Sequence, residues 1–474
     1  MNTKQLRQKI LDLAIRGKLV PQDPNDEPAS VLLERIQAEK EQLIKEGKIK
    51  RSKKDSTISQ SDDKLHYEQL PFDLPNGWTK VKLGSIGNWQ SGSTPSRQNP
   101  AYYGGSIPWL KTGDLNDGLI GYIPEAITDL ALQETSVKLN PAGSVLIAMY
   151  GATIGKLGIL TYPATTNQAC CACSEFVGVD SLYLFYFLLQ HRNEFISKGE
   201  GGAQPNISKE KIVNTLIPLP PIAEQHRIAI AIETAFITID EIERNKDELK
   251  NTISMAKSKI LSLAIQGKLV SQDPNDETAS VLLERIRSEK ELLIKAGKIK
   301  RSKNDSAIIR GDDNCYYDDF PTSWEYCRLD EVLHYEQPTQ YIVESTDYNN
   351  EYETPVLTAG KSFVIGYTNE TNGICSNLPV IIFDDFTTDS KFVNFPFKVK
   401  SSAMKILWTK HANLKYLFYL MQTIECNHTT HKRYWISDYS QNCIMLPPLA
   451  EQHRIVVAIE ATFEQLDNIA ATLT

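Results

Sequence analysis

The sequence predicts an α+β fold in which two α/β inserts are separated by long antiparallel coiled-coil helices, with internal pseudo-twofold symmetry and a cyclic arrangement of the chain. Two repeats predict it. Residues 11–56 and 261–306 are identical at 37 of 46 positions, and residues 219–236 match 446–463 at 13 of 18. The material between the copies is unlike, and two copies are too few for a solenoid. One frame is therefore used twice and carries two different inserts.

The central part of the frame, residues 222–265, predicts one long helix because it contains no Pro or Gly. Pro220 and Pro221 precede it and Gly267 follows it, as is typical of a helix start and stop. At about 1.5 Å per residue the helix would be roughly 65 Å long. Its apolar residues recur in steps of four and three, the spacing of a coiled-coil seam that needs a partner helix. They are Ile228, Ile232, Ala235, Ile239, Ile242, Leu249, Ile253, Ala256, Ile260 and Leu263.

The expected partner of this helix comes from the two ends of the chain. Residues 449–474 repeat 222–247, and residues 1–15 correspond to 251–265, so together they would rebuild all but three residues of a second long helix. One continuous and one split helix are then expected to pack antiparallel, with the inserts related by a pseudo-twofold axis. The expected segments are an N-terminal conserved region 1–66, a first insert 67–218, a central conserved region 219–316, a second insert 317–446 and a C-terminal half-helix 447–474.

A charged spacer follows each copy of the frame helix. Residues 28–46 predict a helix that stops at Gly47, and the basic residues of 48–54 come next. This basic tail fits a solvated linker or a phosphate-binding strip equally well.

The two inserts have unlike sequences but a similar pattern of predicted strands and helices. Residues 143–160 and 379–400 each predict two strands joined by a turn, and residues 181–190 and 413–422 each predict an apolar helix. We therefore expect both inserts to have the same α/β fold.

Several classes of function are excluded or disfavoured. The net charge of −8 counts against a simple nucleic-acid binder. The opening residues lack the apolar core of a signal peptide and no stretch is long enough to span a bilayer, which favours a cytoplasmic location. The run "TAGKS" lacks the first glycine of a phosphate loop, since Pro355 stands there. We expect no catalytic residue, metal site or cofactor in this chain, and hence a binder or organiser rather than an enzyme.

The doubled "GKLV.QDPNDE.ASVLLERI", the doubled "LPP.AEQHRI..AIE" and the "P..W" that opens each insert closely resemble the specificity (S) subunit of type I restriction–modification systems. The resemblance spans essentially the whole chain. It implies two target recognition domains, each reading one half of a bipartite, asymmetric site on double-stranded DNA. It implies that the chain itself is non-catalytic. The negative charge is then tolerable if partner subunits supply much of the contact with phosphates.

The same resemblance implies the partners. Two methyltransferase (M) subunits would dock on the helical conserved regions, bind S-adenosylmethionine and methylate adenine N6. Two restriction (R) subunits would add ATP-dependent cleavage, with ATP and Mg bound there. The alternative is a protein-assembly scaffold whose two inserts bind different proteins and no DNA.

Candidate contact residues follow from loop chemistry, since polar and cationic side chains with nearby aromatics suit base edges and phosphates. The candidate DNA-binding residues are Ser93, Thr94, Arg97, Lys111, Thr112, Gln204 and Asn206 in the first insert, and Lys361, Thr387, Lys391, Lys432, Arg433 and Tyr434 in the second. The candidate subunit-docking residues, from the doubled "AEQHRI", are Glu224, Gln225, Arg227, Glu451, Gln452 and Arg454.

Overall fold

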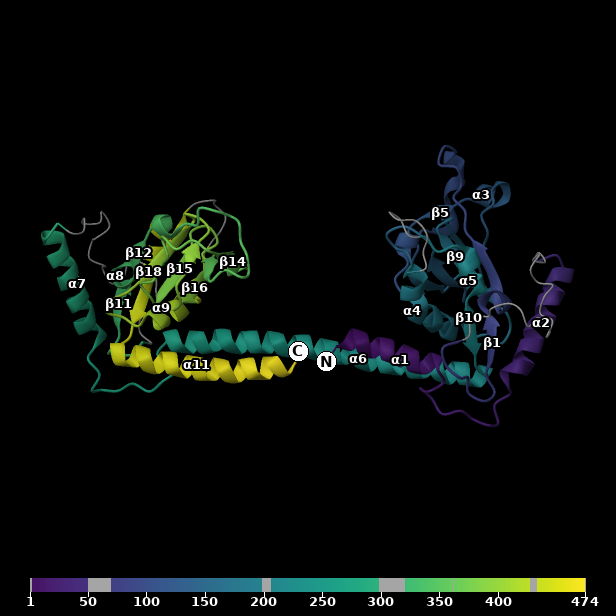
Figure 1. The fold of residues 1–474 in the computed structure, drawn as a ribbon, viewed down its shortest axis with the longest axis horizontal. Coiled ribbons are helices and arrows are strands. Elements are labelled where there is room, and N and C mark those ends of the chain that lie inside the picture. Colours follow the sequence, from purple (N-terminus) through teal and green to yellow (C-terminus); the bar gives the residue numbers. More distant parts are fainter. Residues whose placement is uncertain are drawn as a thin grey trace. The chain divides into compact units, whose positions relative to one another are not determined.

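A computed structural model describes residues 2–49, 70–197, 206–297, 320–360, 362–426 and 433–473. The chain forms two compact units, Met1–Asn245 and Lys246–Thr474, each with an insert held on helices (Figure 1). Helix α6 (Ile222–Ile265) begins in the first unit and ends in the second, with the bounds that the sequence predicts. The mixture of helices and sheets confirms the α+β class.

In the first unit, helix α1 (Thr3–Ile15) packs along α6. Ile228, Ile232 and Ile239 of the predicted seam are buried. Arg7 of α1 lies over the ring of Phe236, 5.0 Å from its centroid, and its Nη2 is 2.5 Å from Asp240. A cation–π contact and an ion pair thus join the two helices.

In the second unit, helix α11 (Leu449–Thr472) packs along the C-terminal part of α6 with the equivalent contacts. Lys257, the counterpart of Arg7, lies 4.9 Å from the centroid of Phe463, and its Nζ is 2.6 Å from Asp467. The seam prediction is wrong near the middle of α6, where Ile242 and Leu249 are each 38% exposed. For Leu249 the reason is length, because α11 runs antiparallel to α6 and ends within five residues of Asp467.

The spacer helices agree with the prediction. Helix α2 (Ala29–Lys45) and its copy α7 (Ala279–Lys295) bury Ala, Leu and Ile on one face against their inserts. Gly47 follows α2 with a φ of +70°, a left-handed conformation that suits glycine at a helix stop.

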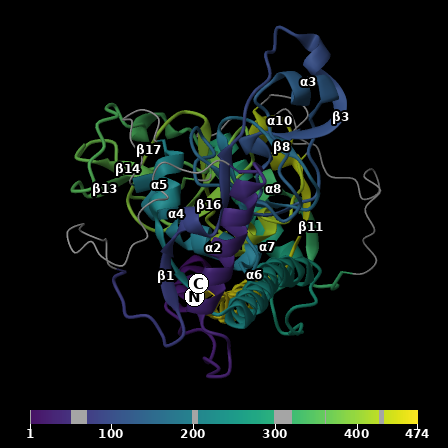
Figure 2. The same cartoon turned by 90° about the vertical axis from the view of Figure 1, so that its right-hand side faces the viewer.

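The first insert contains two larger sheets, with strand orders β2-β9-β6-β7-β4 and β5-β3-β8, and a two-stranded sheet β1-β10 next to the frame. Its strands are β1 (Thr79–Lys82), β2 (Gly87–Ser91), β3 (Tyr103–Leu110), β4 (Gly118–Ile120), β5 (Ala126–Ile127), β6 (Val145–Ala148), β7 (Leu157–Leu160), β8 (Thr165–Thr166), β9 (Cys170–Glu175) and β10 (Leu216–Leu219). Its helices are η1 (Leu83–Ser85), η2 (Pro100–Tyr102), η3 (Thr112–Asp114), α3 (Asp129–Glu134), α4 (Ser181–Ser197) and α5 (Lys209–Asn214). Figures 1 and 2 both show α3 at the end of this unit opposite α6.

The second insert has sheets of order β12-β18-β15-β16 and β14-β13-β17, and the pair β11-β19 next to the frame. Its strands are β11 (Glu325–Arg328), β12 (His334–Glu336), β13 (Thr354–Leu357), β14 (Val364–Thr368), β15 (Val380–Asp384), β16 (Ser390–Val393), β17 (Lys398–Val399), β18 (Met404–Trp408) and β19 (Cys443–Leu446). Its helices are α8 (Leu329–Val332), η4 (Pro338–Tyr341), α9 (Leu414–Met421), α10 (Tyr434–Ser437) and η5 (Tyr439–Gln441).

The two inserts have the same topology, as predicted. The order β2-β9-β6-β7 corresponds to β12-β18-β15-β16, and among the described strands β4 is the one without a counterpart. In the smaller sheets β3 and β13 each pair antiparallel on one side and parallel on the other. The predicted strand pairs are β6 with β7 and β15 with β16, both antiparallel. One backbone plan therefore carries two unlike sets of loops.

Each insert shares a hydrophobic core with its frame helices. The largest core of the first unit runs from Leu11 of α1 and Leu32 of α2 through Phe187 of α4 to Ile232 of α6. The second unit has the equivalent cluster, which includes Leu282 of α7, Leu417 of α9 and Ile455 of α11. Such a continuous core fixes each insert on its frame. Among the residues described, the longest helices are too polar to cross a membrane.

Candidate functional site

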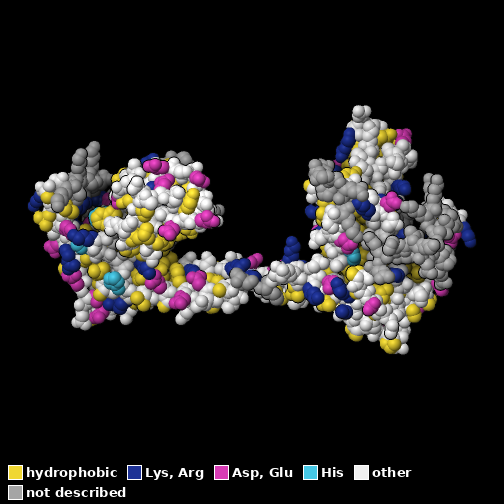
Figure 3. Space-filling view, in the orientation of Figure 1, with side chains coloured by type: hydrophobic (Ala, Val, Ile, Leu, Met, Phe, Trp, Pro, Cys, Tyr) yellow, Lys and Arg dark blue, Asp and Glu magenta, His cyan; other side chains and the backbone are white. Residues whose placement is uncertain are grey.

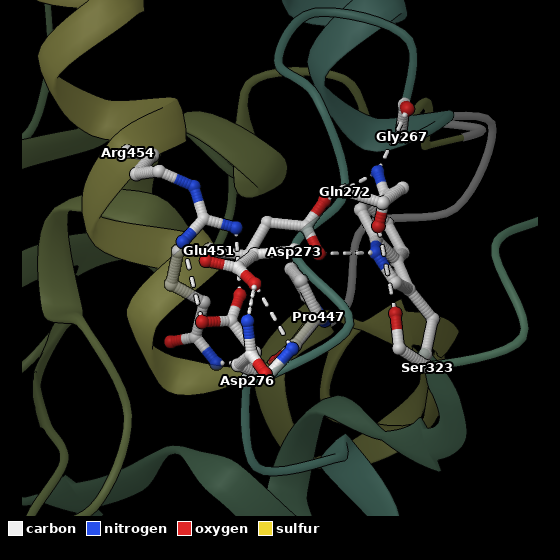
Figure 4. A network of polar contacts seen from close by, with 11 residues as sticks. Gly267, Gln272, Asp273, Asp276, Ser323, Pro447, Glu451 and Arg454 are labelled. Carbon is white, nitrogen blue, oxygen red and sulfur yellow. Dashed lines mark hydrogen bonds and ion pairs between the residues drawn. The ribbon is translucent and has the colours of Figure 1, made fainter.

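A buried carboxylate in each unit holds the tryptophan that opens the insert. In the second unit Glu451 of α11 accepts a hydrogen bond from Trp324 Nε1 at 3.0 Å through Oε2, and one from Gln272 Nε2 at 2.8 Å through Oε1 (Figure 4). Gln272 Nε2 also donates to the carbonyl of Gly267 at 3.2 Å. Burial raises the pKa of Glu451, and the two hydrogen bonds oppose that rise. Glu451 therefore ties helix, spacer and insert together.

The first unit repeats these contacts atom for atom. Glu224 of α6 accepts from Trp78 Nε1 at 2.8 Å and from Gln22 Nε2 at 3.0 Å, and Gln22 also donates to the carbonyl of Gly17 at 2.7 Å. Both carboxylates are about 1% exposed. We call Gln22, Trp78, Glu224, Gln225 and Arg227, with their counterparts Gln272, Trp324, Glu451, Gln452 and Arg454, the frame network.

Arginines of the frame network fix the turn that leads from the frame helix to the spacer helix. Arg227 Nη2 is 2.6 Å from Asp26 Oδ2, and Arg454 Nη2 is 2.6 Å from Asp276 Oδ2. Both aspartates belong to the repeated "QDPNDE". The hydrogen bond to the aspartate is the largest cause that raises the pKa of each arginine. This pairing holds the turn before each spacer helix on the frame helix.

Glutamines of the frame network fix the first apolar helix of each insert. Gln225 Oε1 accepts from the backbone N–H of Asp180 at 2.9 Å, and Gln452 Oε1 accepts from that of Asn413 at 2.8 Å. Both glutamines donate at 2.9 Å to a proline carbonyl that precedes their own helix. Asp180 and Asn413 in turn cap α4 and α9 with their side chains. Identical frame residues thus grip unlike inserts at the same backbone position.

The six predicted docking residues therefore have intramolecular roles. Glu224, Gln225, Glu451 and Gln452 are buried, and Arg227 and Arg454 are partly exposed but paired within the chain. Docking by these residues stays a prediction. Sequence reasoning missed an exposed apolar pair nearby: Ile230 is 63% exposed, and its counterpart Val457 is 67% exposed. Both follow "AEQHRI" by two residues and fall outside the seam, which is the signal that could have identified them.

Candidate residues of the first insert meet at Glu125. Arg97 Nη2 lies 3.0 Å from its Oε2, and Lys111 Nζ pairs with its Oε1. The guanidinium of Arg97 also lies over the Tyr103 ring, 4.4 Å from the centroid. The hydrogen bond from Lys111 is the largest cause that lowers the pKa of Glu125. The two cations are thus held together by one carboxylate, which leaves a net positive charge on the group.

The other candidates of the first insert lie in neighbouring loops. Ser93 Oγ is 2.8 Å from Ser136 Oγ, Thr94 donates to Gln168, and Thr112 opens η3. Asn206 is exposed and forms an isolated β-bridge with Tyr150. Gln204 lies outside the described residues.

The structure brings two candidate loops of the second insert together. Thr387 is exposed in the turn between β15 and β16, and Lys391 lies on β16. Tyr434 N–H donates to the carbonyl of Asp385 in that turn at 2.8 Å, so Arg433, which is exposed, stands beside it. The ring of Tyr434 is 2% exposed, which leaves its side chain unsuited to direct contact with a base. Lys361 and Lys432 lie outside the described residues.

Charges on the surface are mixed. On the face drawn in Figure 3, Lys and Arg side chains alternate with Asp and Glu over both units, without one continuous basic patch among the described residues. This agrees with the net charge of −8. Electrostatic attraction by this face alone would be weak.

The fold and the frame network define a class of chain in which a duplicated helical frame clamps two inserts of one topology and unlike loops. The family model of the type I restriction modification DNA specificity domain matches residues 75–251 and 321–473. Since these segments make up more than half of the sequence, the chain belongs to the family of type I restriction–modification specificity subunits.

Individual relatives agree. The type I restriction enzyme EcoEI specificity subunit of Escherichia coli is 33% identical over 389 residues, which cover 70% of this chain and 62% of that protein. The Escherichia coli EcoR124I/EcoR124II specificity subunit is 53% identical over 130 residues, 26% of this chain and 32% of that protein. The chain thus spans about six tenths of the EcoEI subunit.

One solved structure shares the fold. A chain from a structure of a type I restriction–modification system aligns with a TM-score of 0.53 at 17% identity, over 85% of this chain and 94% of that one.

Proposed function

We propose that this chain is the sequence-specific DNA-binding specificity subunit of a type I restriction–modification complex. Each target recognition domain reads one half of a bipartite, asymmetric site. The observation that carries this function is the contrast between an identical frame network and two inserts of one topology with unlike loops. A shared backbone with different loop chemistry is what two different half-sites require.

The contacts proposed for the first insert are Ser93, Thr94, Arg97, Lys111, Thr112, Gln204 and Asn206, and those for the second are Lys361, Thr387, Lys391, Lys432 and Arg433. Tyr434 is buried, and its N–H donates to the carbonyl of Asp385, so it supports these contacts from within the protein. Arg97 and Lys111 already share Glu125, so they fit directed contacts with base edges better than a phosphate grip. Base contacts then come from the inserts and most phosphate contacts from partner subunits. The mixed surface charge of this chain supports that division.

The frame docks two M subunits, one on each copy, in an arrangement with internal pseudo-twofold symmetry. Two R subunits complete the assembly, with S-adenosylmethionine, ATP and Mg bound by partners in the cytoplasm. We place the centre of each docking surface at Ile230 and at Val457, because these equivalent apolar side chains are exposed beside the frame network. The six polar residues act behind this surface by holding its helix in place.

Methylation by the reconstituted complex tests the main proposal. The purified chain alone is expected neither to methylate nor to cleave DNA. Together with its M subunit it should direct adenine methylation to one split sequence, read by methylome sequencing. Replacing 317–445 with the insert of another family member should change one half of that sequence only. Methyl transfer by the chain alone, or a change in both halves, would contradict the proposal.

Subunit counting tests the docking surface. Ile230→Glu and Val457→Glu should each reduce the number of bound M subunits from two to one, as measured by gel filtration with light scattering. The chain offers a matched control, because the position equivalent to Ile237 already carries a glutamate, Glu464. Ile237→Glu is therefore expected to keep both M subunits.

An assembly that forms but retains no DNA selectively would favour the protein-assembly scaffold instead.

A further inference from the structure

A fully buried ion pair lies at one end of the main sheet of the second insert. Lys405 Nζ of β18 is 2.8 Å from Asp385 Oδ2, which follows β15, and both side chains are 0% exposed. Lys405 Nζ also lies 3.4 Å from Gln337 Oε1, just before η4. Removing two charges from water is unfavourable, and a buried pair is weak evidence for stability. The pair therefore calls for a local role.

Asp385 organises the backbone of the segment that starts at Arg433. Its Oδ1 accepts a hydrogen bond from Trp435 N–H at 2.9 Å, and its carbonyl accepts one from Tyr434 N–H at 2.8 Å. Its own N–H donates to the carbonyl of Ala403 at 2.9 Å. The rings of Tyr434 and Trp435 are buried, so they anchor the segment in the core.

The first insert solves the same geometric problem without charge. Met149 occupies the place of Asp385: its N–H donates to Ala169 at 2.8 Å, and its carbonyl accepts from Ile207 N–H at 2.7 Å. Cys171 occupies the place of Lys405, since it lies opposite Ile147 as Lys405 lies opposite Phe383. Met149 and Cys171 are both buried. The fold therefore accepts an apolar pair at this position. The ion pair is then explained by a contact that is specific to the second insert.

The contact specific to the second insert is a second hydrogen bond to the segment that starts at Arg433. In the second insert the carboxylate of Asp385 adds the Trp435 N–H contact to the backbone contact that both inserts share. Lys405 compensates the charge of that carboxylate on its other oxygen. A charged acceptor makes a stronger and more directional hydrogen bond than a neutral one. The segment that presents Arg433 is thereby held against the turn that carries Thr387.

We propose that Asp385, held by Lys405, is a positioning residue for DNA reading by the second insert. Its carboxylate fixes Trp435 N–H, and through it the orientation of Arg433 beside the Thr387 turn, toward the half-site of double-stranded DNA that this insert reads. The proposal rests on the proposed function.

Three paired substitutions, each replacing Asp385 and Lys405 together, test the assignment without leaving a buried charge alone. Asp385→Met with Lys405→Cys installs the pair of the first insert and removes the acceptor for Trp435 N–H. Asp385→Asn with Lys405→Met removes both charges and keeps a side-chain oxygen as acceptor. Asp385→Leu with Lys405→Met is a second acceptor-free variant, used if the Met/Cys variant does not melt cooperatively. Each full-length variant is assembled with the M subunit.

The readout is discrimination. Complexes are selected against a duplex library randomised in both half-sites, and the ratio of binding to the best half-site over its single-base variants is measured for each half. The acceptor-free variants should lose roughly tenfold or more of this ratio at the second half-site, the size of one directed base contact, and none at the first. The Asn/Met variant should keep it.

Three outcomes would overturn the assignment: full discrimination in the acceptor-free variants, loss in the Asn/Met variant as well, or equal loss at both half-sites. A wild-type complex without any sequence selectivity would instead contradict the proposed function itself. The two failures are therefore distinguishable.

Discussion

The two copies of the frame network and the two inserts differ in opposite ways. Glu224 and Glu451 receive the same two hydrogen bonds from equivalent Trp and Gln side chains. The inserts share strand order yet replace Met149 and Cys171 with Asp385 and Lys405 at equivalent buried places. The residues of the frame network are thus identical in the two copies, whereas the buried residues next to the loops of the two inserts differ. The frame network holds both inserts by the same hydrogen bonds, from the Trp that opens each insert and from the backbone N–H before α4 and α9.

The largest expected effect comes from removing the central carboxylate of one copy of the frame network. Glu451→Leu leaves the buried Trp324 Nε1 without its acceptor and removes one of the two acceptors of Gln272 Nε2, which keeps the carbonyl of Gly267. An unsatisfied buried donor costs about 1–3 kcal/mol and a hydrogen bond to a charged group contributes about 1.5–3 kcal/mol, so we expect a loss of about 3 kcal/mol in the free energy of unfolding. Urea denaturation measures it.

Glu224→Leu is the matched variant in the first unit and should lose a similar amount. Unequal losses, beyond about 1 kcal/mol apart, would show that the two copies are alike in geometry but not in energy.

Much of the frame could be predicted from the sequence because its signals are local. The prolines before Ile222 and the glycine after Ile265 bound α6 as observed, and the spacer helices were equally clear. The docking residues were less clear, since a polar run such as "AEQHR" on a helix resembles an exposed face. Only the tertiary position of Trp78 and Trp324 shows that its glutamates are buried.

The inserts were predictable in kind but not in detail. Strand pairs joined by turns could be read from alternating apolar runs, whereas the order β12-β18-β15-β16 depends on strands distant in sequence. The pairing of Asp385 with Lys405 depends on that order and was not foreseen. Loop chemistry makes Tyr434 a candidate contact, but the fold buries this residue and uses its backbone N–H.

The next effect compares two glycines of the second unit, Gly267, which lies against the insert, and Gly297, which has no such neighbour. Gly267 has a φ of +68°, and an added Cβ would lie 2.6 Å from Pro321 Cγ. Gly267→Ala should therefore cost about 2–3 kcal/mol, from backbone strain and overpacking. Gly297, with a φ of +67°, has nothing within 4 Å of such a Cβ.

Gly297→Ala is thus the control that carries strain alone, at about 1 kcal/mol. Thermal melting should rank the two. Equal melting temperatures would mean that contact with the insert contributes nothing at Gly267.

A pH effect of opposite sign is expected for two frame glutamates. Burial raises the pKa of Glu451, so the folded state binds its proton more tightly than the unfolded state, and its contribution to stability falls as pH rises above its ordinary pKa. Hydrogen bonds from Lys410 and then His411 lower the pKa of Glu289, so its contribution is present above the ordinary pKa and is lost as pH falls.

Urea unfolding between pH 4 and about 6.5 measures both slopes. Glu451→Gln should make stability rise more steeply with pH than in the wild type, and Glu289→Gln less steeply. The same direction of change in both variants would contradict the assigned causes.

The smallest expected effect concerns a position where the two spacer helices differ. Arg287 of α7 stands where α2 has Gln37, and its Nε lies 2.9 Å from Glu331 Oε2 of α8. The equivalent element of the first insert, η1, carries no carboxylate. The spacer helix of the second unit therefore carries Arg287 where its insert carries Glu331, and the first unit has an uncharged residue at both places. Because Arg287 is half exposed, Arg287→Gln should cost only about 0.5 kcal/mol, less at high salt. Gln37→Arg should change stability by less than that. A double-mutant cycle of Arg287→Gln with Glu331→Gln isolates the pair, and a coupling energy near zero at low salt would show that this difference between the two copies is unrelated to the insert.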